Sequence, residues 1–155
     1  MLIYIGADHR GFAIKESIKK YLTDSGYEVV DFGNDKLDAN DDYNDFAANV
    51  AKEISKDPSL GRGILVCGSG VGMDIVANKF RNVRCSLCFS ADHAMSVRTD
   101  DDPNVLALAA DFLDENSAKK IVSVWLQTQF DKKENHVRRI KKIEELETRI
   151  TKYFD

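Results

Sequence analysis

The stretch that decides the fold is Gly63-Ile64-Leu65-Val66-Cys67-Gly68-Ser69-Gly70-Val71-Gly72-Met73, in which an apolar run passes directly into a glycine-rich turn. A continuous apolar run bounded by glycine is typical of a strand that is buried on both faces of a parallel sheet. Glycines after such a strand let backbone amides approach a ligand at the start of the next helix. This stretch therefore predicts a strand, a ligand-binding turn and a helix N-terminus.

Four further apolar runs accompany this one. We expect parallel strands at residues 2–6, 28–32, 63–67, 84–89 and 105–109. The segments between them show apolar residues at helical spacing and are long enough for right-handed crossovers. No linker, repeat or low-complexity stretch divides the chain. The pattern predicts an α/β protein with a three-layer α/β/α, Rossmann-like architecture, a five-stranded parallel sheet and a single domain over residues 1–155.

The last predicted helix, at about residues 135–153, is long for one domain to bury. Its apolar residues Ile140, Ile143, Leu146 and Ile150 recur at helical spacing. Such a stripe packs either on its own sheet or on a partner subunit. We favour a partner subunit.

Composition excludes several classes of protein. The chain has 155 residues, 43% of them hydrophobic and 31% charged, with a formal net charge of -4. This balance is typical of a globular protein and argues against nucleic acid as a partner, because binding to phosphate backbones usually requires a basic surface. The apolar runs fall far short of the roughly 20 residues of a membrane span, and the N-terminus lacks a secretion signal. With three cysteines, an odd number, we expect a cytoplasmic protein with reduced thiols.

Chemistry-bearing residues follow the first strand as Asp8-His9-Arg10-Gly11. In open parallel sheets, ligands gather at the carboxyl ends of the strands, and helix N-termini favour anions. Asp8 has an alternative role as a helix cap, which would account for the acid but not for the neighbouring His9 and Arg10. These residues indicate an anion-binding site.

Cys67 is the candidate base of the glycine turn. We expect the helix dipole and the amides to lower the pKa of its thiol, and the amides to stabilise an oxyanion on a substrate. The alternative is a buried structural cysteine. The dinucleotide-binding motif is not met, because Met73 stands where its last glycine is required. A P-loop needs a Lys-Ser/Thr pair, and none follows Gly72. A cysteine phosphatase would have an arginine that closes the turn, and here that position is also Met73. Cys85 and Cys88 point to opposite faces of a strand, so we expect no metal or redox use of that pair.

Several motifs together resemble the RpiB/LacA/LacB family of sugar-phosphate isomerases, in family order and over nearly the whole chain. They are Gly6-Ala7-Asp8-His9-Arg10-Gly11-Phe12, Asp42-Tyr43-Asn44-Asp45-Phe46-Ala47, the Gly63 to Met73 stretch, Ala77-Asn78-Lys79 and Asn104-Val105-Leu106-Ala107-Leu108. The resemblance implies aldose–ketose isomerisation of a sugar phosphate through an enediolate, without metal or cofactor. It also implies a homodimer with active sites shared between subunits, or a dimer of such dimers.

The resemblance also assigns roles to residues. Cys67 would move the proton, as in the branch of the family that uses a cysteine base, and Ser69 would relay a proton between the substrate oxygens. The amides of the turn would hold the enediolate, and the sugar would contact Asp8, Asp42 and Tyr43. His9, His136 and Arg139 match positions that the family associates with phosphate binding. The binding residues are then Gly68, Gly70, Gly72, Asp42, Tyr43, His9, Arg10, His136 and Arg139.

Three positions depart from the family pattern. Asp100 stands where the family usually has the histidine that opens the sugar ring, and Asp111 and Asn135 replace phosphate-associated arginines. Asp100 could act as the base for ring opening, His93 could replace the histidine, or the substrate could be an open chain. The alternatives to ribose 5-phosphate isomerisation are an isomerase for a hexose phosphate or modified sugar, a non-catalytic sugar-phosphate-binding protein and, on fold analogy alone, a flavodoxin-like protein.

Overall fold

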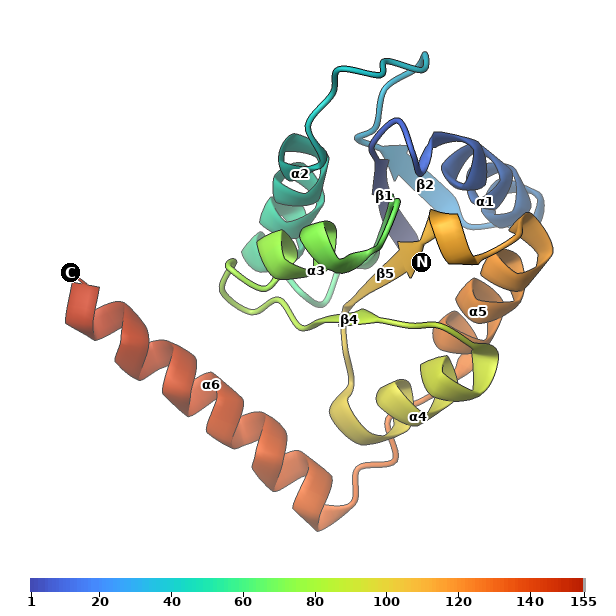
Figure 1. The fold of residues 1–155 in the computed structure, drawn as a ribbon. Coiled ribbons are helices and arrows are strands. Elements are labelled where there is room, and N and C mark those ends of the chain that lie inside the picture. The colour runs from blue at the N-terminus through green and yellow to red at the C-terminus, as the bar shows by residue number, and fades with distance from the viewer. Residues whose placement is uncertain (155) are drawn as a thin grey trace.

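Five parallel strands form one sheet in the order β2-β1-β3-β5-β4. The computed structural model describes residues 1–154, with the side chains of residues 1–150, and residue 155 of the predicted domain lies outside them (Figure 1). The strands are β1 (Leu2–Ala7), β2 (Glu28–Asp31), β3 (Gly61–Cys67), β4 (Cys85–Leu87) and β5 (Val105–Ala109). The helices are α1 (Phe12–Asp24), α2 (Tyr43–Lys56), α3 (Val71–Ala77), α4 (Ala91–Asp101), α5 (Glu115–Gln127) and α6 (Glu134–Phe154), with a 3-10 turn, η1 (Ala110–Phe112).

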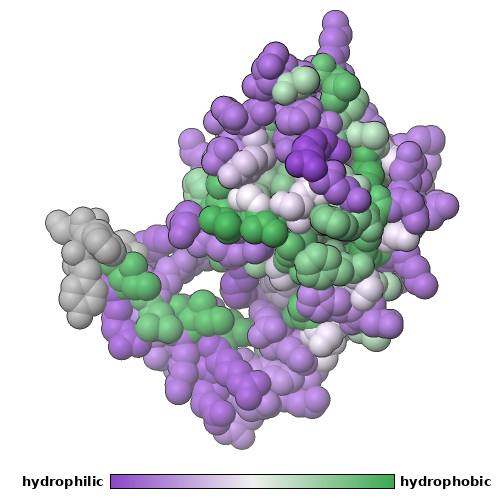
Figure 2. Space-filling view, in the orientation of Figure 1, coloured by the Kyte–Doolittle hydropathy of each residue, from purple (hydrophilic) through white to green (hydrophobic). Residues whose placement is uncertain are grey.

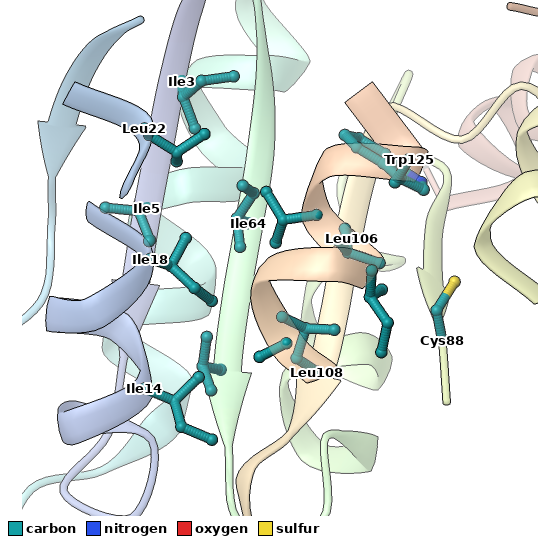
Figure 3. Packing of buried hydrophobic residues seen from close by; sticks show 14 of the residues in the cluster. Ile3, Ile5, Ile14, Ile18, Leu22, Ile64, Cys88, Leu106, Leu108 and Trp125 are labelled. Atoms are coloured by element: carbon teal, nitrogen blue, oxygen red, sulfur yellow. The ribbon is translucent and has the colours of Figure 1, made fainter. Parts of the chain in front are cut away.

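Helices cover both faces of the sheet, which confirms the predicted three-layer α/β fold. Side chains of α1, α4 and α5 pack on one face around Trp125, whose side chain is fully buried (Figure 3). Side chains of α2 and α3 pack on the other face. Val30, in the second predicted strand, is only half-buried because β2 is an edge strand.

The central strands end together. Ala7 of β1 pairs with Val66 of β3, and Cys67 of β3 pairs with Ala109 of β5. The residues that follow these strands therefore meet at one edge of the sheet, called here the carboxyl edge. This edge carries the loop after β1, the glycine turn before α3, and η1.

Helix α6 does not pack on its own sheet. It projects from the body as an arm beyond α4 (Figure 1) and touches the body where the Glu147 carboxylate accepts hydrogen bonds from the Asn82 amide at 2.9 and 3.1 Å. Its apolar residues Ile143, Leu146 and Ile150 are 47%, 49% and 55% exposed. They line a hollow of about 700 Å³ between the arm and the body, visible as apolar surface in Figure 2. Among the described helices, none combines the length and the apolar character that crossing a membrane requires.

Candidate active site

The glycine turn places the Cys67 thiol among backbone amides. Cys67 is the last residue of β3 and is 3% exposed. Gly70 has φ 76°, in the left-handed region that favours glycine, and turns the chain into α3. The amides of Gly70, Gly72 and Met73 favour a negative charge on the Cys67 sulfur. The turn therefore has the geometry of a cradle for an anion.

The expectation that this cradle lowers the pKa of Cys67 is wrong. Burial raises the pKa of the Cys67 thiol, because the thiolate loses its hydration, and the amides offset only part of that effect. The negative charge of Asp8 raises the pKa of Cys67 further, so the carboxylate lies within electrostatic reach of the sulfur. In the unliganded chain, burial therefore disfavours the thiolate form of Cys67.

Asp8 is buried beside the turn, at 5% exposure. One of its oxygens, Oδ1, accepts a hydrogen bond from the amide of Gly11 at 2.9 Å, so Asp8 does help to shape the start of α1. Burial also raises the pKa of the Asp8 carboxyl. A Cβ on Gly11 would lie 2.2 Å from the backbone oxygen of Val66, which shows that this loop packs directly against β3. The two strand ends thus form one compact site.

Arg10 pairs with Asp111 at the same edge. A Cβ on Gly68 would lie 2.4 Å from Cζ of Arg10, so the guanidinium rests on the glycine turn. The Asp111 amide also donates a hydrogen bond to the Gly68 carbonyl at 3.0 Å. An aspartate in place of a phosphate-associated arginine would repel a phosphate, but the charge of Asp111 is neutralised by the neighbouring guanidinium.

Tyr43, Asp42 and Ser69 lie on the exposed side of the site. A Cβ on Gly72 would lie 2.7 Å from the Tyr43 ring, so the ring lies against the glycine turn, and the residue is 38% exposed. Asp42 is exposed immediately before α2. The Ser69 hydroxyl is exposed as well and accepts a hydrogen bond from the amide of Val71 at 3.3 Å.

Asp100 and His136 form a second group, which the chain does not bring to Cys67, and Arg139 follows His136 on α6. Asp100 lies at the end of α4, just before β5 begins, and so at the amino edge of the sheet. The Nδ1 atom of His136 lies 3.8 Å from Oδ1 of Asp100, and His136 is 8% exposed, whereas Arg139 is exposed. Because Cys67 pairs with the last residue of β5, the length of that strand, roughly 13 Å, separates the two groups.

The second group also contains Asp131, which sequence reasoning missed. Its Oδ1 lies 2.9 Å from Nδ1 of His136, and hydrogen bonding to the Lys133 amide together with contact to His136 lowers the pKa of Asp131 to about 2. Donor atoms of Asp100, Asp131 and His136 lie within 4.8 Å of one another, as a cation would require. We assign no ion to them, because Lys133 Nζ, 3.0 Å from Oδ2 of Asp131, already supplies a positive charge.

Asp41 is the second residue that sequence reasoning missed. Its Oδ1 atom accepts hydrogen bonds from the His9 amide at 3.0 Å and from His9 Nδ1 at 2.7 Å. The residue belongs to the polar loop at 33–42, where several acids follow one another. Nothing in that pattern distinguishes the acid that turns inward from those that face solvent.

Comparison with known proteins identifies relatives over most of the chain. Residues 3–143 match the family described as Ribose/Galactose Isomerase. A probable ribose-5-phosphate isomerase B of Mycoplasma genitalium is 40% identical over 91% of this chain and 92% of its own length. A D-erythrulose-4-phosphate isomerase of Pectobacterium atrosepticum is 38% identical over 83% of this chain and 84% of its length.

A solved structure extends the likeness to three dimensions. The crystal structure of Mycoplasma genitalium ribose-5-phosphate isomerase B with bound ribulose-5-phosphate superimposes with a TM-score of 0.92 at 39% identity. The match covers 95% of this chain and 96% of that chain. The family match spans far more than half of the sequence, and the solved structure has the same fold as this chain over nearly its whole length. The chain therefore belongs to the Ribose/Galactose Isomerase family, which the sequence motifs had indicated.

Proposed function

We propose that this protein interconverts an aldose phosphate and the corresponding ketose phosphate through an enediolate, with Cys67 as the base. Family membership makes it an aldose–ketose isomerase of sugar phosphates. The observation that carries the role of Cys67 is the position of its sulfur at the end of β3, within reach of the amides of Gly70, Gly72 and Met73. A purely structural cysteine needs no such surroundings.

The reaction requires one carbon-bound proton to move between neighbouring carbons. The Cys67 thiolate takes the proton from the carbon beside the carbonyl, and the electron pair of that C–H bond becomes the C=C bond of the enediolate. The negative charge that develops on oxygen faces the amides of the glycine turn. Ser69 moves a proton between the two substrate oxygens, and the thiol then returns its proton to the adjacent carbon.

Deuterium exchange tests this chemistry directly. Wild-type protein and Cys67→Ala are incubated in heavy water with sugar phosphates, and proton NMR follows isomer formation and deuterium uptake beside the carbonyl. We expect exchange with the wild type and none with the variant. If Cys67→Ala exchanges as fast as the wild type, another group is the base. If both bind a sugar phosphate equally and neither exchanges deuterium, the protein is a sugar-phosphate-binding protein.

The substrate class depends on how the ring is opened. Asp100 occupies the position of the family's ring-opening histidine, whereas His93 is exposed near the carboxyl end of β4 and stacks on Phe89 with ring centroids 6.0 Å apart. A tetrose 4-phosphate needs no ring opening, because its phosphate blocks the hydroxyl that would close a furanose, and one relative is named for such a substrate. The test panel therefore pairs ribose 5-phosphate with erythrose 4-phosphate and a hexose 6-phosphate. Activity on erythrose 4-phosphate alone would identify an open-chain substrate.

We further propose a cytoplasmic homodimer whose active sites are shared, either alone or as a dimer of dimers. Two observations support the dimer: Asp100 and His136 lie at the opposite edge from Cys67, and the arm α6 exposes an apolar stripe. A twofold dimer would bring the amino-edge group of one copy, with Arg139, to the carboxyl edge of the other. In the proposed dimer, α6 of each copy packs on its partner, as predicted for residues 135–153.

Complementation between variants tests the shared site. Cys67→Ala and His136→Ala are each expected to be strongly impaired, because each removes one half of every site. Unfolding and refolding an equal mixture would form mixed dimers with one intact site, which restores about a quarter of the wild-type sites for random pairing. If mixing restores nothing while dimers form, each site is built within one chain.

A further inference from the structure

The side chain of Asp41 is held from three directions. Its Oδ1 atom accepts hydrogen bonds from the backbone amide of His9 at 3.0 Å and from His9 Nδ1 at 2.7 Å. Its Oδ2 atom accepts from Nδ2 of Asn34 at 3.1 Å. The Asp41 side chain is only 6% exposed, so this carboxylate faces the protein and not solvent. Both of its oxygens are used to hold neighbouring residues in place.

The loop that carries Asp41 is itself anchored to the core. Lys15 has a fully buried side chain, and its Nζ donates to Oδ2 of Asp31 at 2.7 Å and to the backbone oxygen of Asn34 at 3.1 Å. Asn34 in turn holds Asp41. A chain of hydrogen bonds therefore runs from helix α1, through the loop, to the imidazole of His9.

This arrangement determines which nitrogen of His9 meets a ligand. An ionised carboxylate only accepts, so Nδ1 of His9 donates its proton to Asp41. That hydrogen bond also fixes the direction in which the other ring nitrogen, Nε2, points. The His9 side chain is 33% exposed, and its Nε2 has no hydrogen-bond partner within residues 1–150. His9 stands between Asp8 and Arg10, the two residues that lie against the Cys67 turn.

We propose that Asp41 is a positioning residue, which fixes the orientation of the His9 ring so that Nε2 faces and binds the phosphate of the substrate. This inference rests on the proposed function and on the phosphate contact that the family resemblance implies for His9. A phosphate oxygen only accepts, so in the complex both ring nitrogens carry protons, and the ring donates from Nε2 to the phosphate and from Nδ1 to Asp41. Without Asp41 the ring can rotate, and the phosphate loses a preoriented donor.

The first test measures the tautomer of His9 in the wild-type protein. The chain has three histidines, and nitrogen-15 NMR of the neutral rings, with His9 assigned by the spectrum of His9→Gln, identifies the protonated nitrogen. We expect a proton on Nδ1 of His9, and a mixture of tautomers in Asp41→Ala. A neutral wild-type ring with its proton on Nε2 and none on Nδ1 would show that Asp41 does not hold His9 and would overturn the proposal. This measurement needs no turnover, so it stands even if the isomerase assignment fails.

The second test separates binding from chemistry. In Asp41→Ala we expect the KM for a phosphorylated substrate and the inhibition constant of inorganic phosphate to rise about 10-fold, the worth of one charge-assisted hydrogen bond, with kcat changed less than about 3-fold. Asp41→Asn keeps an acceptor and should lie between Asp41→Ala and the wild type. Asp35→Ala, an exposed acid in the same loop, is the matched control. Equal inhibition constants for Asp41→Ala and Asp35→Ala refute the role of Asp41.

Discussion

Replacing the exposed apolar residues of α6 should dissociate the proposed dimer. The change is a triple substitution of Ile143, Leu146 and Ile150 to alanine. These side chains are 47%, 49% and 55% exposed in the single chain, so a partner can still bury about half of each. Full burial of such a side chain stabilises by about 1.5–3 kcal/mol, and half of it by about 1 kcal/mol. Two arms contribute six such side chains, so the expected loss is about 6 kcal/mol, roughly a 10⁴-fold weaker dimer.

Sedimentation velocity over a dilution series measures this loss. The wild type should remain dimeric at concentrations where the triple variant is a monomer, and the specific activity of the variant should fall with dilution in parallel. A matched control replaces Lys141, Glu145 and Thr148, which lie on the opposite face of α6 and are exposed. If the triple variant sediments as the wild type does, or if the wild type is itself a monomer, α6 does not form the interface.

Three further predictions concern the site and the core. Burial raises the pKa of the Cys67 thiol, and the proposed base is the deprotonated form. We therefore expect kcat/KM to rise about tenfold per pH unit until the pH passes that pKa. A profile that is flat from about pH 6 to 9 would contradict a thiolate base. Gly72→Ala places a methyl group 2.7 Å from the Tyr43 ring, so the ring must shift, and KM should rise several-fold while thermal unfolding changes little. Trp125→Ala removes a fully buried ring 5.3 Å from the Arg98 guanidinium, and urea unfolding should show a loss of about 3–5 kcal/mol.

The fold was predictable because burial on both sheet faces leaves a plain signal. The runs around Ile5, Leu65 and Leu106 read as buried strands, and all three residues are fully buried. The order of the strands was not predictable, since it depends on contacts between residues far apart in the sequence. Val30 shows the limit of the pattern, because its apolar run does not reveal that β2 lies at the edge of the sheet.

The electrostatics of the glycine turn were predicted less well than its backbone geometry. Glycines after an apolar run indicate a turn with free amides, and the turn at Gly70 has that geometry. The sign of the pKa shift of Cys67 depends on the depth of burial, which no spacing of residues reveals. Asp41 was missed for a related reason: its neighbours in the loop are equally acidic, and only the folded loop turns this one carboxylate toward His9.

The separation of the two residue groups supports the proposed dimer. Cys67 follows β3 at the carboxyl edge, whereas Asp100 precedes β5 at the amino edge. Parallel strands fix these two edges on opposite sides, and no loop movement in one chain carries the end of α4 across the length of the sheet. A second copy, rotated by a twofold axis, meets no such restriction, because its amino edge can face the carboxyl edge of the first. If Asp100 and His136 take part in catalysis, activity should therefore require the dimer.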